Sequence, residues 1–164
     1  MSDGRVFHAT NGQRHVLRYT GRADYIMAPA IERFAERLFE GNGPGGLVFD
    51  LRQATMLDST NLGLLARLAS RVDQAGGQTT IVSTNDDVTD VLRSMGLAEM
   101  FQIASDDPVL HEVGEGEEIL QEPTGQRELM RTMLEAHRVL ASIDENDSSG
   151  FRAVVEGLES ELRH

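Results

Sequence analysis

The sequence predicts an α/β fold: a mixed β-sheet of four to five strands with parallel βαβ units and packing helices, followed by a C-terminal helical hairpin. Two observations support this prediction. Over residues 1–104, short strand-like segments alternate with segments whose apolar residues recur at helical spacing. Beyond residue 124, two amphipathic helical patterns follow one another. Strands that are separated by single helices favour parallel crossovers, so we expect helices to cover the sheet.

The chain opens with a predicted β-hairpin. Apolar and polar residues alternate over residues 5–10 and 15–20, and the pair Asn11-Gly12 between them is typical of a tight turn. A helix is expected at residues 29–40, where the apolar residues have helical spacing and a proline lies near the start.

The rest of this region continues the alternation. Residues 46–51, GLVFDL, form a short apolar run that suits a strand buried on both faces. The spacing of apolar residues predicts helices at residues 60–74 and 86–95, and β-branched or apolar residues predict strands at 78–83 and 101–104. The predicted order is therefore β-β-α-β-α-β-α-β.

Charge divides the chain unevenly. Residues 1–104 carry 12 acids and 10 arginines, a net charge of −2, whereas residues 105–164 carry 15 acids and 5 arginines, a net charge of −10. This contrast predicts a domain over residues 1–108, an acidic linker over 109–123 and an amphipathic extension over 124–164.

The extension is predicted to be two helices, over residues 127–141 and 151–162, joined by a polar turn at 144–150. Such a hairpin cannot bury its apolar faces alone. It must pack on the domain, on a second copy, which would give a homodimer, or on another partner.

Composition excludes several classes of function. All 15 basic residues are arginine, so a Walker-type phosphate loop and a Schiff-base or pyridoxal-phosphate enzyme lack their amine. The chain has no cysteine and hence no thiolate chemistry. The net charge of −12 argues against binding to nucleic acid or to an anionic membrane. With no long apolar run and a polar start, the chain is expected to be cytoplasmic.

No cofactor or metal is predicted. The five histidines lack metal-ligand spacing, and His137, at the apolar edge of its helix, is interpreted as an interface or half-buried residue. Residues 144–150 resemble the start of a calcium loop, but Ser149 stands where such a loop needs glycine. The glycine-rich residues 41–46 precede a strand and lead into no helix, which predicts a plain connection instead of a phosphate cradle.

The most informative segment is MLDSTNLGLL, residues 56–65. Asp58, Ser59 and Thr60 lie between a buried strand and an amphipathic helix, where such side chains ordinarily cap the helix, a contribution of about 1 kcal/mol. A catalytic triad is not predicted, because no histidine can be placed beside Ser59 from the sequence. The hydroxyls nevertheless emerge at the carboxyl end of a strand, where open parallel sheets bind ligands, and a helix N-terminus can accommodate a phosphate.

These residues resemble the STAS domains of bacterial anti-sigma factor antagonists, whose signature is D-S-[ST]-G-[LIV]-G between an apolar strand and an apolar helix. This chain has Asp58, Ser59, Thr60, Asn61, Leu62 and Gly63 there. The family's G-E-[LI]-D after the second strand corresponds to Gly21, Arg22, Ala23 and Asp24, and its "GL…F-I" ending to Gly96, Leu97, Phe101 and Ile103. The resemblance covers about residues 5–105.

The resemblance implies a STAS fold and a regulator that is not an enzyme. In that family the serine after the aspartate, here Ser59, is phosphorylated by a cognate anti-sigma factor that is a serine kinase. The unmodified protein binds that partner and frees a sigma factor, and a PP2C-type phosphatase removes the phosphate. The implied partner-binding residues are Asp24, Asp58, Ser59, Thr60, Asn61 and Leu62.

Two departures from the family pattern stand out. Asn61 replaces a glycine and adds a side chain beside the acceptor, and the acidic extension exceeds a minimal STAS domain. An alternative function therefore stays open: a STAS scaffold or module that binds a lipid or another small ligand without phosphoregulation.

Overall fold

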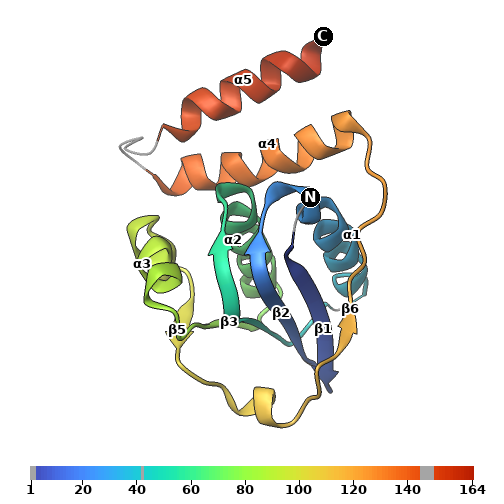
Figure 1. Ribbon diagram of the computed structural model, residues 1–164, viewed down its shortest axis with the longest axis vertical. Helices are drawn as coiled ribbons and strands as arrows, with labels where there is room; N and C mark the ends of the chain where they lie inside the picture. The colour runs from blue at the N-terminus through green and yellow to red at the C-terminus, as the bar shows by residue number, and fades with distance from the viewer. Residues whose placement is uncertain (1–2, 42, 145–149) are drawn as a thin grey trace.

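The computed structural model describes residues 3–41, 43–144 and 150–164 (Figure 1). Within these residues, six strands form one sheet in the order β5-β4-β3-β2-β1-β6. The strands are β1 (Arg5–Asn11), β2 (Arg14–Ala23), β3 (Gly46–Leu57), β4 (Gln78–Val82), β5 (Gln102–Ala104) and β6 (Glu117–Glu118). β1 pairs antiparallel with β2 and β6, and the pairs β2–β3, β3–β4 and β4–β5 are parallel.

Five α-helices and three short 3₁₀ helices accompany these strands in the described residues. They are η1 (Tyr25–Met27), α1 (Ala28–Leu38), α2 (Ser59–Gln74), α3 (Asp86–Ser94), η2 (Leu97–Glu99), η3 (Pro108–His111), α4 (Gln126–Ile143) and α5 (Phe151–Arg163). None of the helices in the described parts of the chain combines the length and the apolar character needed to cross a membrane.

The predicted α/β class and the order of elements are confirmed, with three differences. Asn11 pairs with Arg14, so the hairpin turn is Gly12-Gln13 and not Asn11-Gly12. β3 runs on to Leu57, beyond the apolar run that predicted it. β6 was not predicted, because two exposed glutamates carry no strand pattern and pair with β1 only through the folded chain. The turn predicted at residues 144–150 lies largely outside the described residues.

The two faces of the sheet are covered by different parts of the chain. The main core lies on the face packed by the helices, where Leu17, Phe49 and Leu51 meet apolar residues of α1 and α2. On the opposite face Val16 and Val48, with Val82, pack against Val109 and Leu110 of η3. The segment predicted to be an acidic linker therefore supplies a cover for the sheet and then the edge strand β6.

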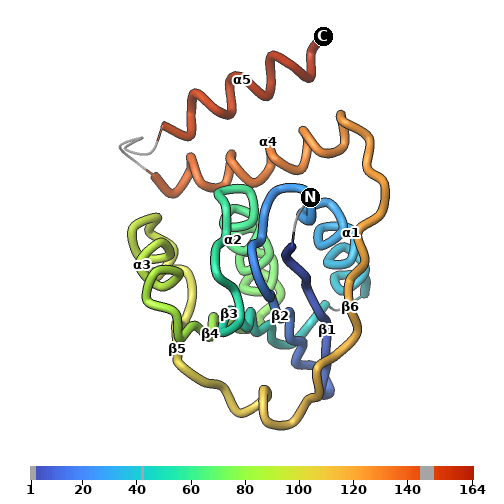
Figure 2. Tube along the Cα trace, in the orientation of Figure 1, coloured from blue at the N-terminus to red at the C-terminus, as the bar shows by residue number. Residues whose placement is uncertain are grey.

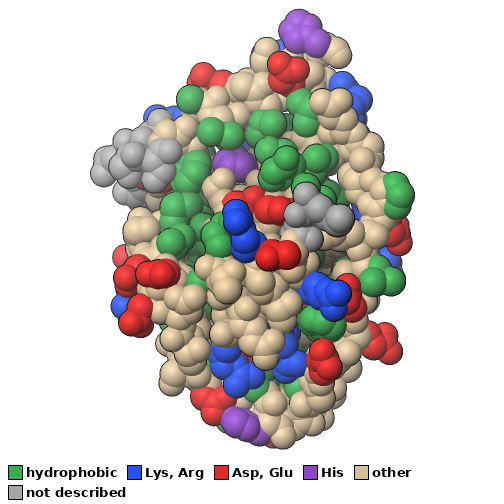
Figure 3. Space-filling view, viewed as in Figure 1, with side chains coloured by type: hydrophobic (Ala, Val, Ile, Leu, Met, Phe, Trp, Pro, Cys, Tyr) green, Lys and Arg blue, Asp and Glu red, His purple; other side chains and the backbone are tan. Residues whose placement is uncertain are grey.

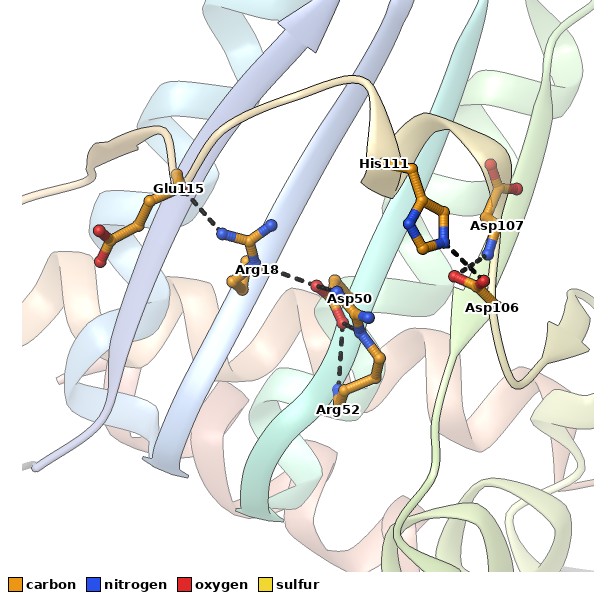
Figure 4. A network of polar contacts seen from close by, with 7 residues as sticks. All are labelled: Arg18, Asp50, Arg52, Asp106, Asp107, His111 and Glu115. Carbon is orange, nitrogen blue, oxygen red and sulfur yellow. Dashed lines mark hydrogen bonds and ion pairs between the residues drawn. The ribbon is translucent and has the colours of Figure 1, made fainter.

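A buried carboxylate helps to fix this cover (Figure 4). Asp50 of β3 has no exposed surface and accepts hydrogen bonds from the guanidinium groups of Arg18 and Arg52 at 2.9–3.0 Å. Burial alone would raise the pKa of Asp50, but these hydrogen bonds outweigh that effect and hold its pKa below the usual range. Arg18 also donates to the carbonyl oxygen of Glu115, at 3.1 Å. The ion pair of Arg18 with Asp50 therefore links the segment after η3 to the sheet.

The hairpin carries two histidines in direct contact. The rings of His8 and His15 stack with centroids 5.1 Å apart, and Nε2 of His8 lies 2.8 Å from Nδ1 of His15. Partial burial lowers the pKa of both residues, and the proximity of His15 lowers the pKa of His8 further, whereas Glu117 of β6 opposes this. The short contact requires that at least one ring be neutral.

We expect this pair to make the free energy of unfolding fall as the solution is acidified. The folded pKa values lie below the unfolded value of 6.5, so the unfolded chain binds more protons, and the stabilisation that is complete above that value is lost as pH falls below it. Urea unfolding from about pH 7.5 to about pH 5.5 should show a shallower pH dependence for His15→Asn than for the wild type. His164→Asn, at the exposed chain end, should keep the wild-type slope; equal slopes for all three proteins would contradict the prediction.

Candidate functional site

The site is built where two parallel strands end side by side. Ala23, the last residue of β2, pairs with Leu57, the last residue of β3, and the N–H of Asp58 donates to the carbonyl oxygen of Ala23 at 3.0 Å. Asp24 and Asp58 each directly follow these paired residues. The strand register therefore places Asp24 and Asp58, both among the implied partner-binding residues, at the same end of the sheet.

Each aspartate caps the helix that follows it. Asp58 Oδ1 accepts from the backbone N–H of Asn61 at 3.0 Å and from its Nδ2 at 2.9 Å, and so it is the N-cap of α2. Asp24 Oδ1 accepts from the N–H of Ile26 at 3.0 Å at the start of η1. Ser59 and Thr60 do not cap α2. They are its first helical residues.

The six predicted partner-binding residues differ in exposure. Asp24, Asp58 and Ser59 are half-buried, whereas Thr60, Asn61 and Leu62 retain at most 3 % of their surface. Asn61 Oδ1 is buried and has no hydrogen-bond partner among the described residues. The structure thus brings the set together, but half of it lies beneath other parts of the chain.

Ser59 contacts a histidine from the C-terminal extension. Its Oγ lies 2.9 Å from Nε2 of His137, and Nδ1 of His137 lies 2.7 Å from the carbonyl oxygen of Met133. A carbonyl can only accept, so Nδ1 carries the hydrogen, and in the neutral ring Nε2 accepts from the Ser59 hydroxyl. The expectation that no histidine lies beside Ser59 is therefore wrong. The ring is oriented by a carbonyl and not by a carboxylate, so the contact lacks the acid of a catalytic triad.

This contact was missed because it depends on the packing of α4 across the domain. His137 is 4 % exposed and lies where α4 packs on α2, so of the two positions that the sequence indicated, interface or half-buried, it occupies the interface. The sequence did indicate that His137 lies on the apolar face of the helix predicted at residues 127–141, and this face had to pack on some surface. The pattern could not tell which surface.

The two helices approach so closely that their backbones nearly touch. A Cβ atom added at Gly63 of α2 would lie 2.3 Å from the carbonyl oxygen of Ala136 of α4, which no real side chain tolerates. Around this crossing α4 buries Leu134, Ala136 and Leu140. α4 lies across the end of the domain where β2 and β3 finish, and α5 lies outside it (Figure 1).

Two exposed apolar residues border the site. Tyr25 and Ile26 of η1, next to Asp24, keep 41 % and 40 % of their surface. The space-filling view shows hydrophobic side chains gathered beneath α4, close to acidic ones (Figure 3). The sequence pattern did not single out these two residues, because a three-residue helix has no periodicity.

Comparison with known proteins identifies the family. The family model of the STAS domain matches residues 8–108, and the chain therefore belongs to the STAS domain family, as the motif around Ser59 predicted. A comparison with curated proteins finds no match.

Solved structures show the same fold. An anti-sigma factor antagonist from Mycobacterium paratuberculosis is 22 % identical, with a TM-score of 0.56 over 68 % of this chain and 94 % of that one. The anti-sigma factor antagonist SpoIIAA in its unphosphorylated form is 17 % identical, with a TM-score of 0.55 over 65 % and 94 %. The Bacillus cell fate determinant SpoIIAA in its phosphorylated form is 15 % identical, with a TM-score of 0.53 over 65 % and 97 %. These shares of the present chain leave a substantial part of it outside each match.

Removing the Asp58 carboxylate should destabilise the folded chain more than neutralising it. Asp58→Ala loses the cap and leaves the buried amide of Asn61 without its acceptor, at a cost of about 1–3 kcal/mol. Asp58→Asn keeps an acceptor oxygen and should lose less. Asp73→Ala, an exposed acid in the last turn of the same helix, is the control and should change stability little. Urea unfolding measures all three variants, and equal losses for Asp58→Ala and Asp73→Ala would contradict the capping role.

Proposed function

We propose that this chain is an anti-sigma factor antagonist that acts by partner switching and is controlled by phosphorylation of Ser59. The unphosphorylated form binds an anti-sigma factor with serine kinase activity and thereby frees a sigma factor. Phosphorylation blocks this binding, and a PP2C-type phosphatase reverses it. The observation that carries the proposal is a serine hydroxyl placed directly after the capping aspartate, at the first residue of α2 in a STAS domain.

The separation of cap and acceptor supports this role. Asp58, and not Ser59, holds the first turn of α2, so Ser59 can be modified while the cap is kept. A phosphate carries about −1.5 to −2 charges at neutral pH. The N-terminal end of a helix stabilises such an anion through its dipole and its free N–H groups, so the fold should tolerate the modification.

The same charge supports a switch in binding. The half-buried Asp24 and Asp58 already lie at this edge of the sheet. A partner surface that fits an uncharged hydroxyl would have to bury an additional unpaired charge, which typically costs several kcal/mol. Exposed Tyr25 and Ile26 add apolar area to the surface that such a partner would contact. Binding can therefore be switched without refolding of the domain.

Ser59 is expected to be the acceptor in preference to its neighbour Thr60. Ser59 is half-buried, whereas the side chain of Thr60 is 2 % exposed within α2. The kinase should be captured from native lysate with a Ser59→Ala bait and then incubated with the purified chain and ATP. Phosphopeptide sequencing should place the phosphate on Ser59, and Ser59→Ala should remove it whereas Thr60→Val should not. A phosphate found mainly on Thr60 would overturn the assignment.

Charge at position 59 is expected to decide affinity. Ser59→Ala should bind the captured kinase at least as well as the wild type, because the site stays uncharged. Ser59→Asp should bind at least about tenfold more weakly, the equivalent of ~1.4 kcal/mol, because it adds a carboxylate beside Asp58. Titration calorimetry measures both affinities.

Similar circular dichroism spectra and melting temperatures would show that both variants at position 59 are folded, since an acid in the first turn of a helix is favoured. Equal affinities of the two variants for the kinase would show that the hydroxyl has no switching role. The module without phosphoregulation would then be the better interpretation.

A further inference from the structure

We propose that the α4–α5 hairpin is a built-in cover of the phosphoacceptor, and that it competes with the partner for the surface formed by the start of α2. This inference rests on the proposed function, because it concerns the same serine and the same partner. It assigns a role to the extension: binding of the kinase and phosphorylation of Ser59 both require that α4 leave its place on α2.

The first argument is the occupation of the hydroxyl. A kinase must bring a phosphoryl group in line with Ser59 Oγ while a base takes the hydroxyl proton. In the folded chain Ser59 Oγ lies 2.9 Å from Nε2 of His137, and in the neutral ring this nitrogen accepts the hydrogen bond from the hydroxyl. Since the His137 ring is itself held by the Met133 carbonyl, it cannot turn aside without breaking a second hydrogen bond.

The second argument is the burial of the binding surface. Thr60, Asn61 and Leu62 retain at most 3 % of their surface, and the backbone of α4 lies against Gly63 one residue further on. α4 contacts the start of α2 at Ser59 and Gly63, so a partner that approaches α2 over these two residues meets α4 instead. The cover and the partner cannot occupy this surface together.

The third argument is the way in which the hairpin is attached. α5 packs chiefly on α4 and lies outside the domain (Figure 2). α4 and α5 are tied to each other by the Arg127 guanidinium, which donates to the Leu162 carbonyl oxygen, and by an ion pair between Arg138 and Glu159 at 3.9 Å. The hairpin can therefore leave α2 as one unit without the loss of its own contacts.

A staple across this interface tests the proposal directly. The chain has no cysteine, so two introduced cysteines can be linked selectively. Arg33 of α1 and Glu128 of α4 form an ion pair, and the pair Arg33→Cys/Glu128→Cys can be joined by a bismaleimide that contains a reducible disulfide. This staple links α4 to α1 of the domain. Neither of its two attachment points is a residue of the predicted partner-binding set around Ser59. Affinity for the captured kinase and the rate of Ser59 phosphorylation should both fall by at least about tenfold, and reduction of the linker should restore them.

The matched control staples the hairpin to itself. The pair Arg138→Cys/Glu159→Cys joins α4 to α5 with the same linker and leaves the interface with α2 unchanged. Because the hairpin moves as a unit, this staple should alter neither affinity nor phosphorylation rate. Equal inhibition by both staples would overturn the proposal.

A second variant opens the cover. Gly63→Ala places a methyl group against the Ala136 carbonyl oxygen and should push α4 away, whereas Gly157→Ala adds the same methyl in open space on α5. Hydrogen exchange should be faster in α4 for Gly63→Ala and unchanged for Gly157→Ala, and the kinase should phosphorylate Gly63→Ala several-fold faster than the wild type. Faster exchange without faster phosphorylation would overturn the cover role.

The outcomes separate this inference from the function on which it rests. If Ser59→Asp weakens kinase binding but the α1–α4 staple does not, the antagonist function stands and the cover role is overturned. If no kinase is retained by the wild-type chain or by either variant at position 59, the proposed function is overturned, and the cover role is overturned with it. If Ser59→Asp and the α1–α4 staple each weaken kinase binding while the α4–α5 staple does not, the antagonist function and the cover role are both supported.

Discussion

The parallel pairing of β2 with β3 is the constraint on which the site depends. Because Ala23 lies opposite Leu57, the two strands finish at the same level, and the residues that follow them, Asp24 and Asp58, start η1 and α2 side by side. A slip of one residue would move each buried side chain to the other face of the sheet. Such a slip would remove from the core four buried side chains of these strands, Leu17, Tyr19, Phe49 and Leu51. The burial of these side chains therefore holds the register, and the register fixes the position of Ser59.

The sequence predicted the local elements well because their signals are local. Helical spacing located α1 to α5, and the motif around Ser59 located the junction of β3 with α2. Ser59, Asp58 and Asp24 were named from the family motifs, and the role of Ser59 as phosphoacceptor stays a prediction. What could not be predicted depends on contacts between distant segments: β6 on β1, the Asp50 carboxylate with its two arginines, and His137 against Ser59. In each of these the residue type is ordinary and only the tertiary neighbour gives it meaning.

The two helices of the extension show how one sequence pattern can have two outcomes. Both have an amphipathic stripe, yet α4 lies between the domain and α5 and buries Leu134 and Leu140, whereas Val155 and Leu158 of α5 are only half-buried and Val154 is exposed. An outer helix has one neighbour where an inner helix has two. The stripe of α5 therefore contributes less to stability per residue, and a homodimer through the helical extension stays a prediction.

At the start of α2, the residue that caps the helix and the proposed phosphoacceptor are different residues. If the serine itself capped the helix, the oxygen that provides the cap, worth about 1 kcal/mol, would be the atom that is modified. Here the carboxylate of Asp58 provides the cap, and the hydroxyl of Ser59 contacts His137 of the extension. In the proposed switch, a phosphate on Ser59 would replace this contact with α4, whereas the Asp58 cap of α2 would be kept. The contact that a phosphate on Ser59 would break belongs to the extension beyond the residues that match the STAS model, so the proposed modification would leave the contacts within the domain in place.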